Sequence, residues 1–255
     1  MSLKHLAIIM DGNGRWANAN GKKRKDGHKA GALKVREITE FCAKRKITHL
    51  TLYAFSTENW KRPKIEVDFL MHLLEKYLND EEESYIKNNI CFNTIGDISY
   101  LNTKLQERII YLKEKTKDFS NLTQILALNY GSQDEISRAA LLSFKSIIKN
   151  LKDNNFQSEP IEDANKIDVL TRLDSLLSKN LLQELIDKNL DTANMPPVDL
   201  LLRTGGEKRL SNFLLWQLSY AELFFTDTFW PELSIEELAR ILDSFDERQR
   251  RFGGL

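Results

Sequence analysis

The sequence of 255 residues has only two cysteines, Cys42 and Cys91. They stand in apolar surroundings and lack the spacing of metal ligands, so neither a disulfide framework nor a zinc motif is indicated. We expect both to be reduced thiols of the core, as in a cytosolic protein. No apolar run reaches the ~18 residues that a membrane span needs. The first expected strand begins by Leu6, which leaves no room for a signal peptide, so we expect a cytoplasmic location.

The chain also lacks an excess of charge of either sign, with 37 basic and 37 acidic residues. A nucleic-acid-binding protein would show a basic excess, so this class is disfavoured, although residues 22–25 form a local basic run. The motifs Gly-x-x-x-x-Gly-Lys-Ser/Thr and strand-linked Gly-x-Gly-x-x-Gly are missing, which argues against ATP and dinucleotides. The Asp-Asp-x-x-Asp motif of trans-prenyl synthases is missing too.

The most informative stretch is residues 6–16, where an apolar run stops at Asp11 and continues Gly12-Asn13-Gly14-Arg15. This pattern predicts a buried strand that runs into a tight loop. The glycines allow amide groups to turn toward an anion, the carboxylate suits Mg²⁺, and the guanidinium suits phosphate oxygens. The alternative is an ordinary turn in which Asn13 forms an Asx turn.

Strand and helix patterns alternate along the rest of the chain, which predicts an α/β fold with a central, mostly parallel sheet flanked by helices. We find no domain boundary and expect one domain over residues 1–255. In residues 66–87 a wide apolar arc indicates either a core helix or the wall of an apolar channel. Residues 152–166 read as a polar surface excursion. We expect strands over residues 6–10, 48–55, 90–96, 122–129, 198–202 and 223–230, and helices over residues 27–46, 66–87, 101–117, 134–151, 169–177, 181–189, 211–218 and 234–245.

Polar residues gather where three of these strands end. Because the carboxyl ends of parallel strands share one edge of the sheet, we expect these residues to form one pocket. A carboxylate, glycine amides and at least four arginines there would suit a highly charged anion, most simply two diphosphates with Mg²⁺. The three groups are Asp11 and Arg15; Ser56, Asn59 and Arg62; and Arg203, Arg209 and Ser211.

Seven blocks of the sequence together resemble the signature blocks of the cis-prenyltransferase (isoprenyl transferase) family, and most of all its bacterial undecaprenyl diphosphate synthases. The blocks are residues 6–16, 27–31, 52–60, 197–200, 203–207, 211–217 and 221–225. The resemblance implies an apolar tunnel beside the sheet, a homodimer, and repeated condensation of isopentenyl diphosphate onto farnesyl diphosphate. The product would be undecaprenyl diphosphate, a lipid carrier precursor for bacterial cell-wall peptidoglycan. Because that product is apolar, transient association with the inner face of the membrane is left open.

The resemblance also implies roles for individual residues. Asp11 and Glu222 would bind Mg²⁺, and Asp11 would assist departure of the allylic diphosphate. Asn59 is the proton acceptor that the family suggests, although a neutral amide is a poor base and could instead orient the substrate. Residues 251–253 resemble a C-terminal motif that reaches the partner's site. The expected substrate-binding residues are Gly12, Asn13, Gly14, Arg15, Trp16, Arg24, His28, Ser56, Thr57, Glu58, Trp60, Arg62, Arg203, Arg209, Leu210 and Ser211.

Two rival functions follow from the same residues. The chain could be a non-catalytic regulatory subunit of a prenyltransferase complex, but such subunits usually lack the first-loop aspartate or the arginines. It could also be a generic diphosphate-binding α/β module. Two stretches depart from the family pattern: Ser132-Gln133 follows Gly131 where relatives usually have Gly-Arg, and residues 152–194 match the pattern poorly. In addition, Lys208 stands where some relatives carry a histidine.

Overall fold

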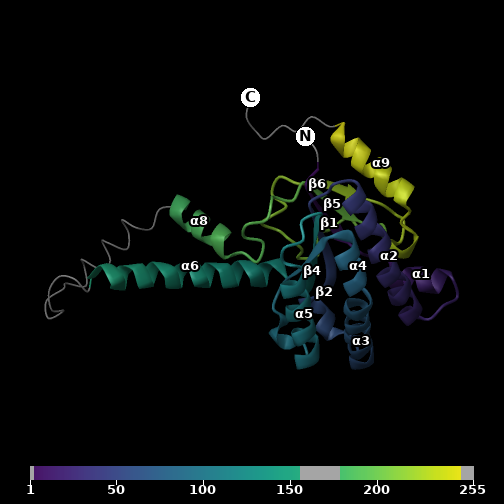
Figure 1. The fold of residues 1–255 in the computed structure, drawn as a ribbon, viewed down its shortest axis with the longest axis horizontal. Coiled ribbons are helices and arrows are strands. Elements are labelled where there is room, and N and C mark those ends of the chain that lie inside the picture. The colour runs from purple at the N-terminus through teal and green to yellow at the C-terminus, as the bar shows by residue number, and fades with distance from the viewer. Residues whose placement is uncertain (1–2, 156–178, 248–255) are drawn as a thin grey trace. The chain divides into compact units, whose positions relative to one another are not determined.

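The computed structural model describes residues 3–155 and 179–247. Within these residues, six strands form one entirely parallel sheet in the order β3-β4-β2-β1-β5-β6 (Figure 1). The expected α/β fold class is therefore confirmed. The strands are β1 (His5–Ile9), β2 (His49–Ser56), β3 (Ile90–Ile95), β4 (Leu122–Tyr130), β5 (Leu200–Arg203) and β6 (Glu222–Phe225).

The helices divide between two compact units. The sheet and most helices belong to a unit built from residues up to Gly131 and from Pro196 onward. Its helices are α1 (Asn13–Ala19), α2 (Arg24–Lys44), α3 (Lys64–Asp80), α4 (Glu82–Asn88), α5 (Thr103–Thr116) and α9 (Ile235–Asp246), with 3-10 turns η1 (Thr57–Lys61), η2 (Ile98–Tyr100) and η3 (Trp230–Glu232).

The second unit contains α6 (Ser132–Asn155) and α8 (Lys179–Asn189). The Arg138 guanidinium of α6 binds both carboxylate oxygens of Asp191 at 2.9 Å, just beyond α8. Residues 156–178, where part of the polar excursion and one predicted helix fall, lie outside the described residues. The prediction of one domain over the whole chain stays a prediction.

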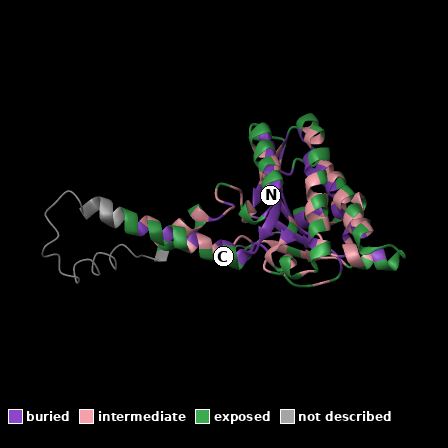
Figure 2. Cartoon of the chain, turned by 90° about the horizontal axis from the view of Figure 1, so that it is seen from below, coloured by how far each residue is buried: buried purple, intermediate pink, exposed green. Residues whose placement is uncertain are grey.

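The core of the first unit follows from the apolar strands. Every residue of β1 is buried, because this strand lies between β2 and β5 with both faces covered. Figure 2 shows the inner strands as mostly buried, while the helices expose their outer faces; the edge strand β6 is intermediate or exposed. On α2, Val35, Ile38 and Cys42 are buried at helical spacing, as expected. None of the described helices is long and apolar enough to cross a membrane.

The single helix expected over residues 66–87 is wrong. It is two helices, α3 and α4, and the break falls at Glu81. The Glu81 side chain is buried, and its carboxylate accepts a hydrogen bond of 2.7 Å from Arg36 Nε of α2. A buried charge of this kind needs a partner from another segment, and periodicity alone does not reveal it.

The helix expected over residues 211–218 is also wrong. Ser211, Asn212 and Leu214 have φ angles of 49°, 60° and 47°, which a right-handed helix does not allow. Strained positions of this kind persist where neighbouring contacts hold them, and they cluster at functional sites. Here the Arg203 guanidinium donates to Ser211 Oγ at 2.7 Å. This contact with the end of β5 holds the loop in a form that the helical pattern alone does not predict.

Candidate active site

The candidate site lies at β1, where the order in which strands are added to the sheet reverses. β2, β4 and β3 lie in that order on one side of β1, whereas β5 and β6 lie on its other side. In parallel sheets such a switch point forms a crevice outside the carboxyl ends of the strands. Ile9 at the end of β1 pairs with Arg203 at the end of β5. Asp11, two residues past Ile9, therefore reaches the same edge as Arg203.

Asp11 is held by two guanidinium groups and by the backbone. Arg203 donates to Asp11 Oδ2 at 2.8 Å, and Arg15 Nη2 lies 3.2 Å from Asp11 Oδ1. The Asp11 amide donates to Thr204 Oγ1 at 3.0 Å, and Thr204 Oγ1 donates back to the Asp11 carbonyl at 2.8 Å. Burial of the Asp11 carboxyl would raise its pKa, but the two arginines outweigh it and the pKa lies below the ordinary value. Asp11 is therefore a carboxylate at neutral pH.

Arg203 organises the loop that follows β5. Its side chain is only 4% exposed, and its guanidinium also donates to the Arg209 carbonyl and to Ser211 Oγ. The Arg209 side chain is largely exposed and pairs with Glu207. Glu207 also lies 3.6 Å from Arg15. Sequence reasoning missed Glu207, although its place after two glycines at a strand end was a usable signal.

Glycine is required at two turns of this edge. Gly12 has a φ of 108°, and a Cβ there would come within 3.0 Å of the Phe229 backbone. Gly205 has a φ of 83°, and a Cβ there would lie 2.9 Å from the Arg15 guanidinium. Gly12 also caps α1, so Asn13 begins a helix where we had expected a loop. The first amides of α1 consequently lack intrahelical acceptors.

A second cluster of basic side chains joins α2 to the segment before α3. Arg24 Nε, Arg62 Nη1 and His28 Nε2 lie 3.1, 2.9 and 3.7 Å from one oxygen, Oε1 of Glu66. Burial, helped by the positive charges of Arg62 and Arg24, lowers the pKa of His28 from 6.5 to about 4, although the Glu66 carboxylate acts in the opposite direction. His28 is thus neutral at pH 7 and offers a hydrogen bond rather than a charge. Glu66 was not anticipated from the sequence.

The two clusters face one polar pocket. Asp11 and Arg15 line it from the β1 edge, and Arg24, His28 and Arg62 line it from the other side. The side-chain oxygen of Asn13, Oδ1, is buried there and has no hydrogen-bond partner in the described part of the chain. A buried polar atom without a partner in such a pocket is suited to a ligand. The full lining is Met10, Asp11, Gly12, Asn13, Gly14, Arg15, Asn18, Arg24, His28 and Arg62.

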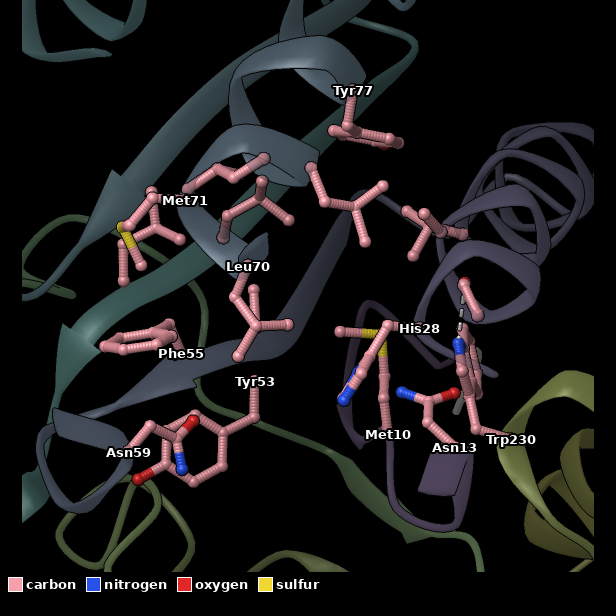
Figure 3. A pocket seen from close by; sticks show the side chains of 18 of the residues that line it. Met10, Asn13, His28, Tyr53, Phe55, Asn59, Leu70, Met71, Tyr77 and Trp230 are labelled. Atoms are coloured by element: carbon pink, nitrogen blue, oxygen red, sulfur yellow. Dashed lines mark hydrogen bonds between the residues drawn. The ribbon is translucent and has the colours of Figure 1, made fainter. Parts of the chain in front are cut away.

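An apolar cavity opens beside this polar pocket. The two share Met10, Asn13, His28 and Arg62 as lining residues. Figure 3 shows Asn13, His28 and Asn59 around one end of the cavity, with Leu70, Met71 and Phe55 beyond them. Both readings of the α3 arc hold in part, because Val67 and Leu78 are buried in the core while Leu70, Met71, Leu73 and Leu74 line the cavity. The apolar lining comprises Met10, Ala32, Val35, Ala54, Phe55, Leu70, Met71, Leu73, Leu74, Leu126, Leu128 and Trp230.

A buried polar network stands at the opposite end of the cavity. Tyr77 lines the cavity at the end remote from Asn13 and Asn59 (Figure 3). Its hydroxyl lies within hydrogen-bond distance of the fully buried Gln124 of β4, which accepts from Tyr85 at 2.6 Å and donates to Thr39 at 2.6 Å. Such a connected network rigidifies its surroundings. The network therefore fixes the Tyr77 side chain, which bounds this end of the cavity.

The turn η1 after β2 holds several expected site residues through local contacts. Asn59 Oδ1 accepts from the Ser56 amide at 3.1 Å, as the last member of a capping box. Its carbonyl oxygen is thus engaged, which does not favour Asn59 as a proton acceptor. The Trp60 indole donates to Asn129 Oδ1 at 2.8 Å, and Glu58 Oε1 accepts from Asn212 at 3.2 Å. Neither Trp60 nor Glu58 lines the two pockets described above.

Other expected residues lie elsewhere. Thr57 lies in η1 and packs near Gly131, and Trp16 of α1 stacks under the Lys22 ammonium at 4.6 Å. Leu210 sits between Arg209 and Ser211 in the loop that Arg203 holds. These residues line neither pocket. The C-terminal motif at residues 251–253 lies outside the described residues.

Glu222 is not brought to Asp11. It begins β6 and pairs with Leu200, whereas Arg203 pairs with Phe225 at the other end of the strand. Three strand residues separate the two positions, roughly 10 Å. Among the described residues, no group of three or more His, Cys, Asp or Glu side chains could hold a metal ion. The expected pair of metal ligands is therefore not assembled within the described part of one chain, because a strand sequence does not reveal which of its ends faces the site.

Asp11 alone still fits one kind of metal site. Mg²⁺ is commonly held by one or two carboxylates together with substrate phosphates, rather than by a protein cage. Asp11 is ionised, its side chain is 29% exposed, and it lines the polar pocket. A single carboxylate beside a pocket for phosphates is the donor set that such a shared site requires.

Comparison with known proteins agrees with this geometry. A family model described as putative undecaprenyl diphosphate synthase matches residues 9–253. The isoprenyl transferase of Helicobacter hepaticus is 55% identical over 252 residues, which cover 99% of this chain and 97% of that protein. The isoprenyl transferase of Campylobacter jejuni is 43% identical over 251 residues, 98% of each chain.

Two solved structures are similar along the whole chain. A probable undecaprenyl diphosphate synthase from Campylobacter jejuni superposes with a TM-score of 0.73 at 39% identity and full coverage of both chains. Lavandulyl diphosphate synthase from Lavandula x intermedia, in complex with dimethylallyl diphosphate, gives a TM-score of 0.83 at 30% identity over 99% of each chain. The predicted resemblance to cis-prenyltransferases is confirmed. The chain belongs to the undecaprenyl diphosphate synthase family of isoprenyl transferases.

Proposed function

We propose that this transferase condenses isopentenyl diphosphate repeatedly onto farnesyl diphosphate to give undecaprenyl diphosphate. The observation that carries the proposal is the junction of the polar pocket with the apolar cavity through Met10, Asn13, His28 and Arg62. A molecule with a charged head and a long apolar tail needs both environments at a fixed separation. The bound dimethylallyl diphosphate of the lavandulyl diphosphate synthase structure supports diphosphates as the substrate class.

The allylic diphosphate is assigned to the polar pocket. Arg24 and Arg62 would neutralise its charge and bind its oxygens through their planar guanidinium groups. His28, neutral at pH 7, would donate one hydrogen bond, and the residues Gly12 to Gly14 would place amides close to the phosphate. The farnesyl tail would enter the apolar cavity, where it displaces water from Leu70, Leu74 and their neighbours.

The diphosphate of isopentenyl diphosphate is assigned to the loop after β5. Arg203 fixes the Arg209 carbonyl and Ser211 Oγ, so the loop is preorganised around a buried guanidinium. The exposed Arg209 side chain can leave Glu207 for an incoming anion. The two diphosphates would then lie on either side of Asp11. In this arrangement the isopentenyl double bond can attack the allylic carbon while the bond between that carbon and the allylic diphosphate breaks.

Asp11 would hold the metal of this family, which we propose to be Mg²⁺. When bound, the ion supplies positive charge to the departing diphosphate. Glu222 stays a prediction as the second Mg²⁺ ligand, and its position at the start of β6, away from Arg203, does not support that role. Since Asn59 Oδ1 already accepts from Ser56, we assign Asn59 to substrate orientation and the proton to a diphosphate oxygen or water. A homodimer, a cytoplasmic location and a role in peptidoglycan precursor synthesis complete the proposal.

The test is to incubate the purified chain alone with labelled isopentenyl diphosphate, farnesyl diphosphate and Mg²⁺. Chromatography of the extracted lipid should show products that grow in five-carbon steps up to the undecaprenyl chain. A regulatory subunit would give no turnover without a partner chain. A generic diphosphate-binding module would bind both substrates without forming a lipid. Either of those results would refute the proposal.

A further inference from the structure

Exposed lysines flank, along the sequence, two arginines that line the polar pocket, Arg24 and Arg62. Lys22 and Lys23 precede α2, and Lys25 and Lys29 lie on its first turns. Lys61 ends η1 and Lys64 begins α3. All six are exposed. We call these six lysines the basic rim.

The two parts of the basic rim are neighbours although some forty positions separate them in the sequence. Arg24 lies among the first four lysines, and Arg62 lies between the last two. Both guanidinium groups bind the same oxygen of Glu66, at 3.1 and 2.9 Å, and both line the polar pocket. The basic rim therefore borders the entrance of the pocket from α2 and from α3.

The charge of this region differs from that of the chain as a whole. Residues 20–29 contain four lysines and one arginine against one aspartate, whereas the whole chain is neutral. That aspartate, Asp26, accepts from the Lys23 amide and so caps α2. On the α3 side the acids are Glu58, which accepts from Asn212, the shared Glu66, and the exposed Asp68. A clear positive excess remains at the entrance.

Apolar side chains stand among these lysines and face solvent. Ile65 follows Lys64 in the first turn of α3 and is 85% exposed, and Trp60, next to Lys61, is 38% exposed. Lysines beside an exposed aliphatic and an indole side chain are the composition of interfacial membrane-binding surfaces. The lysines attract anionic headgroups, and the apolar side chains insert among them.

We propose that the basic rim with Ile65 docks on an anionic phospholipid surface. The biological reason for this docking rests on the proposed function, because the lipid product of that reaction must pass from the apolar cavity to a membrane. The binding itself does not depend on turnover. A membrane is favoured over nucleic acid because Ile65 would gain nothing from a phosphate backbone. It is favoured over an acidic protein because the polar pocket beside the rim continues into an apolar cavity, with which it shares Arg62 and His28.

Flotation of the full chain with phosphatidylcholine vesicles, with and without phosphatidylglycerol, tests the proposal at low and high salt. The variant Lys61→Glu/Lys64→Glu/Ile65→Ser alters the basic rim without touching the pocket lining. The control Lys44→Glu/Lys87→Glu/Ile86→Ser makes the same changes at exposed positions. Lys44 ends α2, 20 residues after Arg24 begins it, which is about 30 Å along the helix.

We expect the unaltered chain and the control to bind anionic vesicles at low salt and to be released by high salt. Each lysine near an anionic surface increases the membrane partition coefficient roughly fivefold. The rim variant should therefore bind anionic vesicles at least tenfold more weakly than the unaltered chain. Equal binding by the rim variant would overturn the proposal, as would absence of binding by the unaltered chain or stronger retention on duplex DNA. Turnover of farnesyl diphosphate in detergent solution, measured alongside, should be unchanged in the rim variant, so failure of the proposed function is seen separately.

Discussion

Replacing Asp11 by Asn removes a charge while keeping the shape of the side chain. In the folded protein the Asp11 carboxylate accepts from Arg203, whose side chain is 4% exposed. The Asn oxygen can still accept this hydrogen bond, so only its charge-assisted part is lost. We expect the free energy of unfolding to fall by about 1–2 kcal/mol. At roughly 2–4 °C per kcal/mol, the melting temperature should fall by a few degrees and the fold should persist.

The effect on turnover should be much larger. Without the carboxylate the proposed Mg²⁺ loses its protein ligand, and stabilisation of the departing diphosphate by several kcal/mol is lost. A loss of about 4 kcal/mol corresponds to a decrease in kcat of about 10³-fold. Binding of inorganic pyrophosphate without Mg²⁺ should stay the same or tighten, because the substitution leaves more positive charge in the pocket.

The assay is single-turnover condensation of labelled isopentenyl diphosphate, combined with thermal unfolding and calorimetric titration of pyrophosphate. Asp68→Asn, an exposed carboxylate of α3, is the matched control and should behave as the unaltered chain. Turnover by Asp11→Asn within a few-fold of the unaltered chain would refute the assigned role. So would an equal loss in the control, since that loss could not be specific to Asp11.

Three further predictions follow from the described contacts. Arg203→Ala should raise the KM for isopentenyl diphosphate at least tenfold more than that for farnesyl diphosphate, and equal changes would contradict the division of the site. Tyr77→Ala should remove the cavity floor and lengthen the product lipid, whereas Tyr77→Phe should leave its length unchanged; chromatography distinguishes the two. Burial holds the pKa of His5 at about 4 against 6.5 when unfolded, so the unfolded chain takes up its proton first as pH falls. Stability present at neutral pH should therefore decrease by about 2 kcal/mol between about pH 7 and pH 5, and urea unfolding of His5→Gln should show a shallower decrease.

The sheet could be predicted from the sequence because most of its strands are apolar runs that end at a polar residue or a glycine. The same rule brought Asp11 and Arg203 to one edge, since the carboxyl ends of parallel strands lie together. Arg15 and Arg62 of the pocket were expected because each follows a predicted strand, whereas Arg24 was expected only from the resemblance to a family. The family itself was predicted from the motif blocks, which follow one another along nearly the whole chain in the family's order.

What could not be predicted depends on contacts between distant segments. Glu66 looked like an ordinary first-turn residue of α3, yet it holds Arg24 and Arg62 together. Glu81, between α3 and α4, is buried and pairs with Arg36 of another helix, which the apolar spacing of this stretch did not show. In the same way, a local pattern could not show that Glu222 lies at the far end of β6 from Arg203.

The central claim is that one molecule spans the polar pocket and the apolar cavity. A crystal structure of the chain with a non-hydrolysable farnesyl diphosphate analogue and Mg²⁺ tests it most directly. We predict the diphosphate against Arg24, His28 and Arg62, with the metal at Asp11 and the tail pointing toward Tyr77. An analogue whose diphosphate binds away from these side chains, or whose tail lies outside the cavity, would contradict the account.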